Sequence, residues 1–465
     1  MAVTATPPVL ITPAPYEVSF GRIAGRISRD ARMLLVGIDG RVVARRDLNR
    51  RSTFDVHIQL PQRRFRLTVT AVYDAQRRAG TTVRAVYGLP RAGEPRAPPR
   101  RSVQDPELAR EIRTLAQRFP GLCGIYVQNL RTGAGAAWNA RAEFPAASTL
   151  KVAIAVEVLR ALRGPPAEGS RLDVLMRKAI VPSDDKAAND LLTWLGGSTS
   201  GGSAKVNATF RFLGLHDTEM YGGYIVPAAT PIPLERNAQP SFVGKRTTAW
   251  DFARLLRYLH EASAGKGRLA RRGGFVPSEA KYLLYLLAHS QPSYLARYLD
   301  GTGVSVLDKP GWIKRARHDG GLAFWREGSF VAVVLTYNER GVGVSSEILA
   351  GRVARAAYAV FSGAKAQSSA ARRDPQADPR GLLRAARGER APQPRPSDVL
   401  HSGEAVVRDG AERPSRRRAL RDVVRGGGRP PGDARQGGPG ALLPAAVRGP
   451  PGLARRPPRR RAPLG

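Results

Sequence analysis

FPAASTLKVAIAVEVLRAL, residues 144–162, is the stretch that decides the fold of this chain. From Lys151 onward the run is apolar on nearly every side, which predicts a helix buried inside a domain. Its early polar side chains include Ser148 and Lys151. Residues three apart on a helix share a face, so we expect Lys151 to lie over Ser148. The segment therefore predicts a nucleophilic hydroxyl with an amine base beside it.

The chemistry of this pair depends on the charge of the lysine amine. Desolvation and the positive end of a helix both lower a lysine pKa, which is about 10.4 in water. A neutral amine could take the proton of Ser148, which an arginine could not. The alternative is that Ser148 caps the helix and Lys151 reaches out to solvent. Four other S-x-x-K matches in the chain show that the motif alone is weak.

Two further motifs follow in order along the chain. PSDDKAAND (182–190) places Ser183 on a short loop before a helix, and LDKPGWIKRARHDGG (307–321) places Lys309 on an expected strand. With STLK, this set resembles class A β-lactamases and the related penicillin-binding serine enzymes, in which S-x-x-K, S-D-N and K-T-G occur in that order. The resemblance covers about residues 105–361 and includes the segment TTAWDFARLL at 247–256.

The resemblance implies a catalytic role for four side chains. Ser148 would attack a carbonyl and form an acyl-enzyme, with Lys151 as the base, directly or through water. Ser183 would relay a proton to the leaving nitrogen. Lys309 would supply positive potential for the substrate carboxylate and for Ser183.

The resemblance also implies how the substrate is held. The backbone N–H groups of Ser148 and Trp312 would form the oxyanion hole, and Trp312 directly follows Gly311, the glycine of the third motif. Asn189 would hold the loop that faces the site. The substrate-binding residues would be Asp185, Gly311 and Arg315.

Two positions depart from the family pattern. Asp185 replaces the Asn of S-D-N, so a carboxylate stands where an amide would donate to a substrate carbonyl. Pro310 replaces the Thr of K-T-G, which removes a hydroxyl and a strand N–H. Arg315 or Arg317 could compensate as a partner of the substrate carboxylate, or could be a strand-end charge without a role.

Deacylation is the step for which the sequence is least complete. Class A enzymes carry an E-x-x-L-N segment on the loop before the TT helix, and its Glu activates the hydrolytic water. Here Glu235 is the only acid between Glu219 and Asp251, and Asn237 follows it two residues later. Glu235 is therefore the candidate for deacylation, and an exposed loop glutamate is the alternative.

The pattern along the chain divides it into five stretches. The hairpin signal Asp39-Gly40 and alternating apolar residues mark an all-β region, whereas the last hundred residues have too few apolar side chains to fold. We expect a flexible lead-in (1–15), a small immunoglobulin-like β-sandwich (16–90), a Pro/Arg linker (91–104), a three-layer α/β (α+β) serine β-lactamase-like domain with an antiparallel sheet (105–362) and a disordered tail (363–465), which is polybasic or read out of frame. In the fourth stretch we place the last two strands near Val304–Ile313 and Phe330–Tyr337 and the final helix at Ser346–Phe361. His318-Asp319 could suggest a Ser–His–Asp site, but the resemblance implies a structural turn there, which favours packing.

The amino-acid composition limits which kinds of binding partner are expected. The net charge is +37, but only ten of the 75 Lys+Arg residues are Lys, and the Arg residues are spread over the whole chain, which indicates codon bias rather than a nucleic-acid surface. Cys123 is expected to be a small buried strand residue. We expect no metal, no cofactor, no transmembrane segment and no signal peptide in this sequence; the oligomeric state is open. The resemblance implies an extracytoplasmic location.

The sequence therefore predicts a serine hydrolase that is acylated at Ser148 by β-lactams and hydrolyses the lactam amide. One alternative is a peptidase acting on D-Ala-D-Ala-type cell-wall peptides, or a penicillin-binding protein that deacylates slowly. Asp185 and Pro310 favour that alternative. A second alternative is a non-catalytic cell-wall binding protein, against which the retained Ser148 and Lys151 speak.

Overall fold

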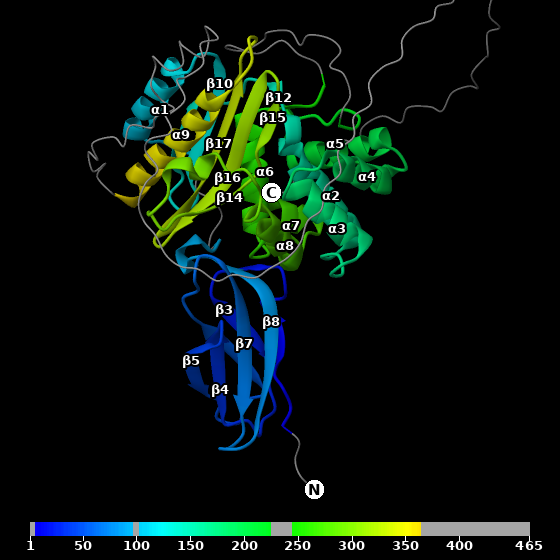
Figure 1. The fold of residues 1–465 in the computed structure, drawn as a ribbon, viewed down its shortest axis with the longest axis vertical. Helices are drawn as coiled ribbons and strands as arrows, with labels where there is room; N and C mark the ends of the chain where they lie inside the picture. The colour runs from blue at the N-terminus through cyan, green and yellow to red at the C-terminus, as the bar shows by residue number, and fades with distance from the viewer. Residues whose placement is uncertain (1–4, 96–101, 225–243, 364–465) are drawn as a thin grey trace, which may run out of the picture. The chain divides into compact units, whose positions relative to one another are not determined.

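The computed structural model describes residues 5–95, 102–224 and 244–363 (Figure 1). Glu235 and Asn237, the middle of the predicted linker and nearly all of the predicted tail lie outside these ranges.

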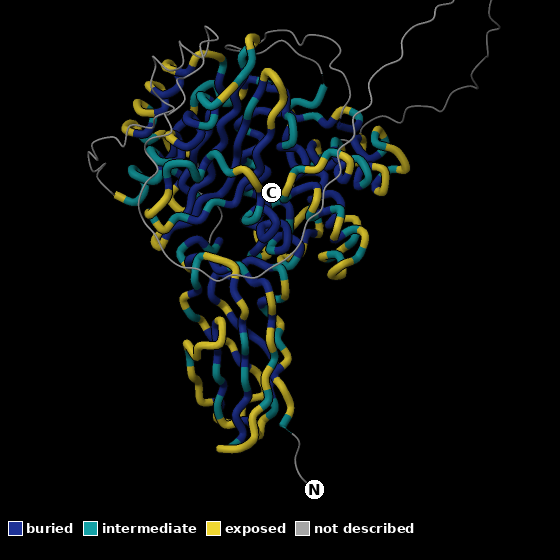
Figure 2. Tube along the Cα trace, viewed as in Figure 1, coloured by how far each residue is buried: buried dark blue, intermediate teal, exposed yellow. Residues whose placement is uncertain are grey.

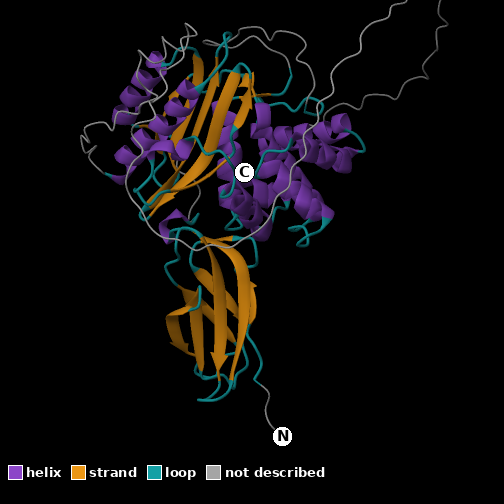
Figure 3. Cartoon of the chain, viewed as in Figure 1, coloured by secondary structure: helices purple, strands orange, loops and turns teal. Residues whose placement is uncertain are grey.

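Residues 9–88 form two β-sheets, and Figure 3 shows strands and loops in this region. One sheet has the order β1 (Val9–Thr12), β3 (Arg22–Arg26), β6 (Thr53–His57). The other has the order β2 (Val18–Ser19), β8 (Arg78–Gly88), β7 (Arg64–Val72), β4 (Met33–Ile38), β5 (Arg41–Asp47).

Alternating burial holds these strands together. Phe65, Leu67 and Val69 of β7 are buried and share one hydrophobic cluster with Ile23 of β3 and Val56 of β6, so side chains of both sheets meet in one core. The expectation of an all-β N-terminal region is therefore confirmed, whereas its immunoglobulin-like character stays a prediction.

The hairpin between β4 and β5 follows the expected turn chemistry. Asp39 has φ of 48° and Gly40 has φ of 86°, and two successive positive φ angles are what a two-residue type I′ turn requires.

The expectation of a flexible lead-in over residues 1–15 is wrong for its second half. Residues Val9–Thr12 form β1, which pairs antiparallel with β3. Val9 and Ile11 remain 62% and 64% exposed, so backbone pairing rather than side-chain burial orders this edge strand. The sequence did not predict β1, because its order depends on pairing with β3 and its own Pro/Thr-rich composition is typical of a flexible segment.

A larger sheet lies in residues 103–337. Its order is β14 (Ser305–Asp308), β16 (Ala316–Trp325), β17 (Gly328–Tyr337), β10 (Leu122–Asn129), β11 (Ala134–Trp138), β9 (Val103–Gln104), and the short β15 (Gly311–Ile313) also pairs with β16. All pairings are antiparallel except that between β9 and β11. Strand β9 shows that the end of the predicted linker already belongs to this sheet.

Helices cover both faces of the sheet (Figures 1 and 3). In the described residues they are α1 (Pro106–Arg118), α2 (Lys151–Leu162), α3 (Arg171–Ile180), α4 (Asp185–Gly196), α5 (Thr199–Leu213), α6 (Ala249–Ala262), α7 (Gly267–Gly273), α8 (Pro277–Leu287) and α9 (Val344–Ser362). None of these helices has the length and apolar character needed to cross a membrane.

Successive side chains of β17 point to opposite faces of the sheet and show which helices cover each face. Phe330, Ala332 and Val334 pack with α1 and α9, whereas Val331 and Val333 point to the other face and join the cluster that contains α2 and α6. The sheet is therefore buried on both sides, as its dark blue strands in Figure 2 show, and the three-layer expectation is confirmed.

The expected strand positions need one correction. The predicted final helix corresponds to α9, but an additional strand, β16, runs through residues 316–325, where the resemblance implies a turn at His318-Asp319. Both residues are almost fully buried in the strand. The sequence did not predict β16, because its polar and glycine residues are typical of a turn. In the structure the His and Asp of this strand form hydrogen bonds with groups of the protein interior rather than with water.

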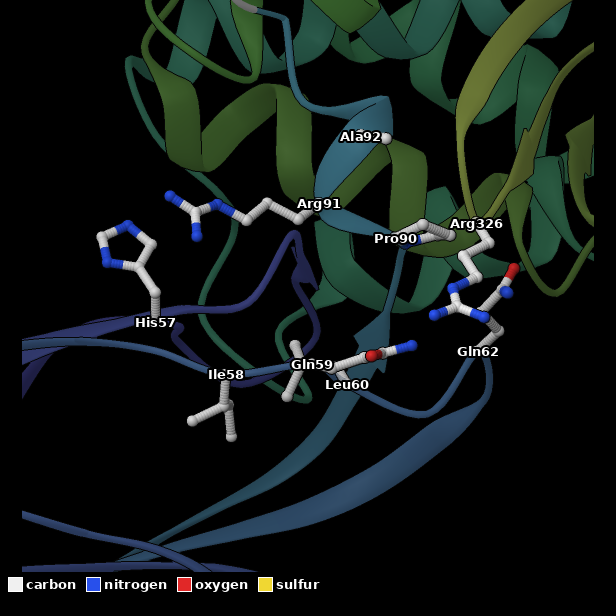
Figure 4. A pocket seen from close by; sticks show the side chains of 9 residues that line it. All are labelled: His57, Ile58, Gln59, Leu60, Gln62, Pro90, Arg91, Ala92 and Arg326. Atoms are coloured by element: carbon white, nitrogen blue, oxygen red, sulfur yellow. The ribbon is translucent and has the colours of Figure 1, made fainter.

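The two regions share a core. Phe20 and Leu89 belong to the same hydrophobic cluster as α2 and α6. The start of the predicted linker is also fixed, since the Gly93 carbonyl bonds to Nε2 of His260 at 2.7 Å. Nearby, a pocket of about 300 Å³ is lined by His57, Arg91 and Arg326 among others (Figure 4).

Candidate active site

Ser148 lies in a 3₁₀ turn, Ala147–Leu150, which leads directly into α2. Ala147 has a φ of 48°, a left-handed conformation that a residue with a side chain rarely adopts. Thr149 Oγ1 donates to the Ala146 carbonyl at 2.6 Å and helps to hold this turn. Ser148 is half-buried, and strained backbone of this kind is typical of positions where a side chain must be presented for function.

Strand β15 lies directly against the backbone of Ser148. A Cβ atom placed on Gly311 would come within 2.9 Å of the Ser148 nitrogen and 3.0 Å of the Thr149 nitrogen, so only glycine fits there. Trp312 follows in β15, is 43% exposed and pairs with Arg317 across the ladder. The structure thus brings the third motif to the backbone of the first.

Lys151 is buried, with none of its side chain exposed. Its ammonium donates to Asp185 Oδ1 at 2.6 Å, to Ser183 Oγ at 3.3 Å and to the Ser183 carbonyl. The alternative in which Lys151 reaches out to solvent is therefore wrong: the side chain turns inward to the second motif.

Two opposing effects act on the charge of Lys151. Burial lowers its pKa, and the hydrogen bond and charge of Asp185 raise it, with burial the larger effect. The net pKa is lowered, which is the direction that a lysine needs to act as a base.

Lys309 is also fully buried, between the ends of β14 and β15. Its backbone N–H donates to Gly320 at 2.9 Å, and its ammonium donates to the Pro310 carbonyl at 3.0 Å. Burial, followed by the charge of Lys151, lowers the pKa of Lys309 to about 7. The interaction with Lys151 shows that the two lysines share one electrostatic site.

Two buried carboxyl groups accompany Lys309. Asp308 precedes it on β14, and Asp319 lies on the neighbouring strand β16, where its Oδ2 accepts the backbone N–H groups of Tyr294 and Leu295 at 2.8 and 2.9 Å. Burial raises the pKa of Asp319 to about 6 and that of Asp308 well above its usual range. The buried carboxyl groups of Asp308 and Asp319 are therefore the acidic neighbours of Lys309.

Pro310 belongs to neither β14 nor β15. We expected Pro310 to donate no hydrogen bond within the sheet, and it lies in the gap between β14 and β15. Arg315, expected as a compensating partner for the substrate, instead pairs with Glu339 at 3.1 Å, with more than half of each side chain exposed. Arg317 is likewise paired, with Glu347.

Ser183 and Asn189 occupy the loop and the helix of the second motif. Ser183 has a φ of 62°, a second left-handed residue at this site, and Asp184 caps α4 by accepting the Ala187 N–H at 2.6 Å. Asn189 accepts the backbone N–H of Tyr224 at 2.7 Å and donates to the Tyr224 carbonyl at 3.4 Å. Asn189 thus holds Tyr224 at both backbone groups.

Sequence reasoning missed Tyr224 and Lys245. The Tyr224 ring lies 4.6 Å from the ammonium of Lys151 and 4.8 Å from that of Lys245. One signal was available, because Lys is rare in this Arg-rich chain and Lys151, Lys245 and Lys309 are three of its ten lysines.

The remaining candidates do not form a second centre in the described residues. His318 bonds through Nε2 to the Pro145 carbonyl and through Nδ1 to the Thr336 N–H, and burial lowers its pKa to about 4, so it packs rather than forming a triad. Cys123 is buried in β10, and burial raises its pKa to about 12. Within the described ranges no group of three His, Cys, Asp or Glu residues is arranged to hold a metal.

Comparisons with known proteins show the family of this chain. A model of the β-lactamase enzyme family matches residues 107–165 and 165–361. No curated protein matches the chain. Among solved structures, PBP-A is similar over 57% of this chain and 100% of its own, with 21% identity and a TM-score of 0.46. A β-lactamase from Sphaerobacter thermophilus is similar over 55% of this chain and 97% of its own (22% identity, TM-score 0.44), and a class A β-lactamase from Mycobacterium abscessus over 55% and 99% (20% identity, TM-score 0.44).

Proposed function

Because the chain belongs to the β-lactamase enzyme family, we propose that it opens β-lactam amides by acylation of Ser148. The observation that supports this proposal is that the three motifs, which lie far apart in the sequence, are linked to one another in the structure. Gly311 lies against its backbone nitrogen, and Lys151 bonds to Ser183 while sharing an electrostatic site with Lys309.

The acylation step follows from these groups. Neutral Lys151 takes the proton of the Ser148 hydroxyl while Oγ bonds to the lactam carbonyl carbon. The backbone N–H groups of Ser148 and Trp312 stabilise the oxyanion. The carbon–nitrogen bond then breaks, and the nitrogen receives a proton through the Ser183 hydroxyl, which the bond to Lys151 at 3.3 Å supports.

Lys309 would bind the substrate carboxylate. Its ammonium carries the positive charge needed below a pH of about 7, and it donates to the neighbouring Pro310 carbonyl rather than to a carboxylate. Arg315 is committed to Glu339 and is not part of this proposal.

We further propose that the acyl-enzyme is released slowly. Fast hydrolysis needs a carboxylate to activate water. Among the described residues, the one that Asn189 holds beside Lys151 is Tyr224, and the sequence candidate Glu235 lies outside them. A buried phenol, whose pKa burial raises well above its ordinary value, is no general base at neutral pH. This observation favours the penicillin-binding alternative, with a cell-wall peptide as the natural acyl donor and an extracytoplasmic place of action, over a β-lactamase with rapid turnover.

A fluorescent penicillin tests the proposal. We expect covalent labelling of the wild-type protein and none of Ser148→Ala, with Ser200→Ala as the matched serine control, because Ser200 is exposed on α5. A chromogenic cephalosporin should give a single burst followed by slow turnover. Absence of label on folded wild-type protein, or equal label on Ser148→Ala, would refute acylation at this serine; sustained rapid hydrolysis would refute slow release.

A further inference from the structure

Lys245 is fixed next to the segment that carries the nucleophile. Its carbonyl accepts the backbone N–H of Ala146 at 2.8 Å. The residues that follow form β13 (Arg246–Thr247), which pairs antiparallel with β12 (Phe144–Pro145). The backbone of Lys245 is therefore tied to a residue only two positions before Ser148.

The side chain of Lys245 returns to the site. Its ammonium lies over the Tyr224 ring at 4.8 Å, and the Lys151 ammonium lies over the same ring at 4.6 Å. Lys245 is half-buried. Among the residues that the structure describes, none accepts a hydrogen bond from its ammonium, so a cation–π contact is what holds it.

The charges that act on Lys245 are those of Asp185 and Lys151. Asp185 attracts it and Lys151 repels it, while burial lowers its pKa. The Asp185 carboxylate is already engaged with Lys151 at 2.6 Å. The Asp185 carboxylate thus acts on two ammonium groups, and Asp184 acts on Lys151 as well. A third cation, Lys309, interacts with Lys151 and Asp185 and has Asp308 and Asp319 as further acidic neighbours.

This arrangement suits a substrate that carries two anionic groups. Lys309 and Lys245 each interact with Lys151 and Asp185. Lys309 also has the carboxyl groups of β14 and β16 as neighbours. Lys245 instead lies over the ring of Tyr224. A substrate with its scissile carbonyl at Ser148 and its leaving-side carboxylate at Lys309 would extend its acyl part past Asp185 toward Lys245.

We propose that Lys245 binds a second carboxylate, on the acyl part of the substrate, so that the site prefers acyl donors with negative charge on both sides of the scissile amide. The proposal rests on the acylation of Ser148 proposed above. It names the substrate class as a peptide with an acidic residue on the acyl side, or a penicillin with a carboxylated side chain. A partly desolvated ammonium for which the described residues supply no hydrogen-bond acceptor attracts such a group.

Two penicillins that differ by one carboxylate test this inference. Benzylpenicillin and α-carboxybenzylpenicillin would be reacted with wild-type protein, Lys245→Met and Lys245→Arg, and the second-order acylation rate constants compared as a ratio. Taking the ratio cancels any general effect of a substitution on folding or on Ser148. Lys186→Met is the matched control, because Lys186 is next to Asp185 in sequence but points to solvent, where it pairs with Asp190 at 2.9 Å.

We expect the ratio of the carboxylated to the neutral penicillin to fall about tenfold in Lys245→Met and to stay within about twofold in Lys245→Arg and Lys186→Met. Added salt should lower the wild-type ratio, because it screens the interaction. An unchanged ratio in Lys245→Met would overturn this inference alone. Failure of both penicillins to acylate the wild-type protein would overturn the proposed function and the inference with it.

Discussion

At the residue scale, the ion pair between Lys151 and Asp185 sets the pH range of the reaction. Asp185 raises the pKa of Lys151 against the effect of burial. In Asp185→Asn the carboxylate charge is gone, so the pKa of Lys151 should fall and its neutral form should exist at lower pH. We expect the acid limb of the acylation rate against pH to move to lower pH.

The measurement is the benzylpenicillin acylation rate constant across about pH 5 to 9. Asp190→Asn is the control, since it makes the same chemical change on the same helix in a surface pair with Lys186. An acid limb that stays in place or moves to higher pH in Asp185→Asn would contradict this assignment of the base.

Lys309 sets the opposite limb. Its pKa is lowered to about 7, so its ammonium is present below that pH and is lost as the pH rises through it. The acylation rate of the wild-type protein should therefore decline above about pH 7. In Lys309→Arg the charge persists, so the alkaline limb should disappear from the accessible range while the folded state, checked by circular dichroism, remains. An identical alkaline limb in both proteins would assign it to another group.

The sequence motifs predicted the residues whose neighbours lie close along the chain. The spacing of three residues linked Ser148 with Lys151 before any fold was known, whereas Ser183 and Asn189 were assigned through the resemblance of their segment to a family motif. Lys245 was not predictable in this way. Its place depends on the pairing of β12 with β13 and on the contact with Tyr224, neither of which a local pattern encodes.

At the scale of elements, the approach of β15 to the 3₁₀ turn of Ser148 positions the site. In Gly311→Ala the new methyl group would meet the Ser148 nitrogen at 2.9 Å, so strand or turn must shift. A displacement near 1 Å at a reacting centre costs about 100-fold in rate, and we expect a loss of this order in acylation. Gly164→Ala is the control, because nothing lies within 4 Å of its Cβ position.

The outcome is read from penicillin labelling kinetics together with the unfolding temperature. Retained folding with slow labelling is the expected result for Gly311→Ala. Labelling at the wild-type rate would show that the contact between β15 and Ser148 has no part in the reaction.

Elements were predictable where the periodicity was clean. The amphipathic α1 and the closing α9 have clear helical patterns, and β10 with β11 has an obvious turn. Strand β16 was missed because His318 and Asp319 read as turn residues, although both are buried and bonded to backbone groups. Tertiary hydrogen bonds, which no local pattern contains, make these polar residues acceptable inside a strand.

At the scale of the whole molecule, the N-terminal sheets and the hydrolase region are joined by apolar contacts. The ring of Phe20 lies 5.9 Å from that of Phe324 and 6.2 Å from that of His260, measured between centroids. All five tryptophans lie between Trp138 and Trp325, so tryptophan fluorescence reports on the hydrolase region alone.

We expect Phe20→Ala to lower the free energy of unfolding by about 3 kcal/mol, as large aromatic truncations in cores do. The fluorescence-monitored midpoint should shift even though the substitution lies in the N-terminal region, because both regions contribute to one core. A midpoint equal to that of the wild-type protein would mean that the hydrolase region unfolds independently of the N-terminal sheets.

Every step of the proposed mechanism depends on one covalent bond, between Ser148 and the opened lactam. The most direct measurement is the intact mass of the protein after incubation with benzylpenicillin and removal of the excess. We predict a mass increase of one benzylpenicillin on the wild-type protein that decays slowly, and no increase on Ser148→Ala. Folded wild-type protein that leaves benzylpenicillin intact and gains no mass, or a Ser148→Ala protein that gains it, would contradict the claim.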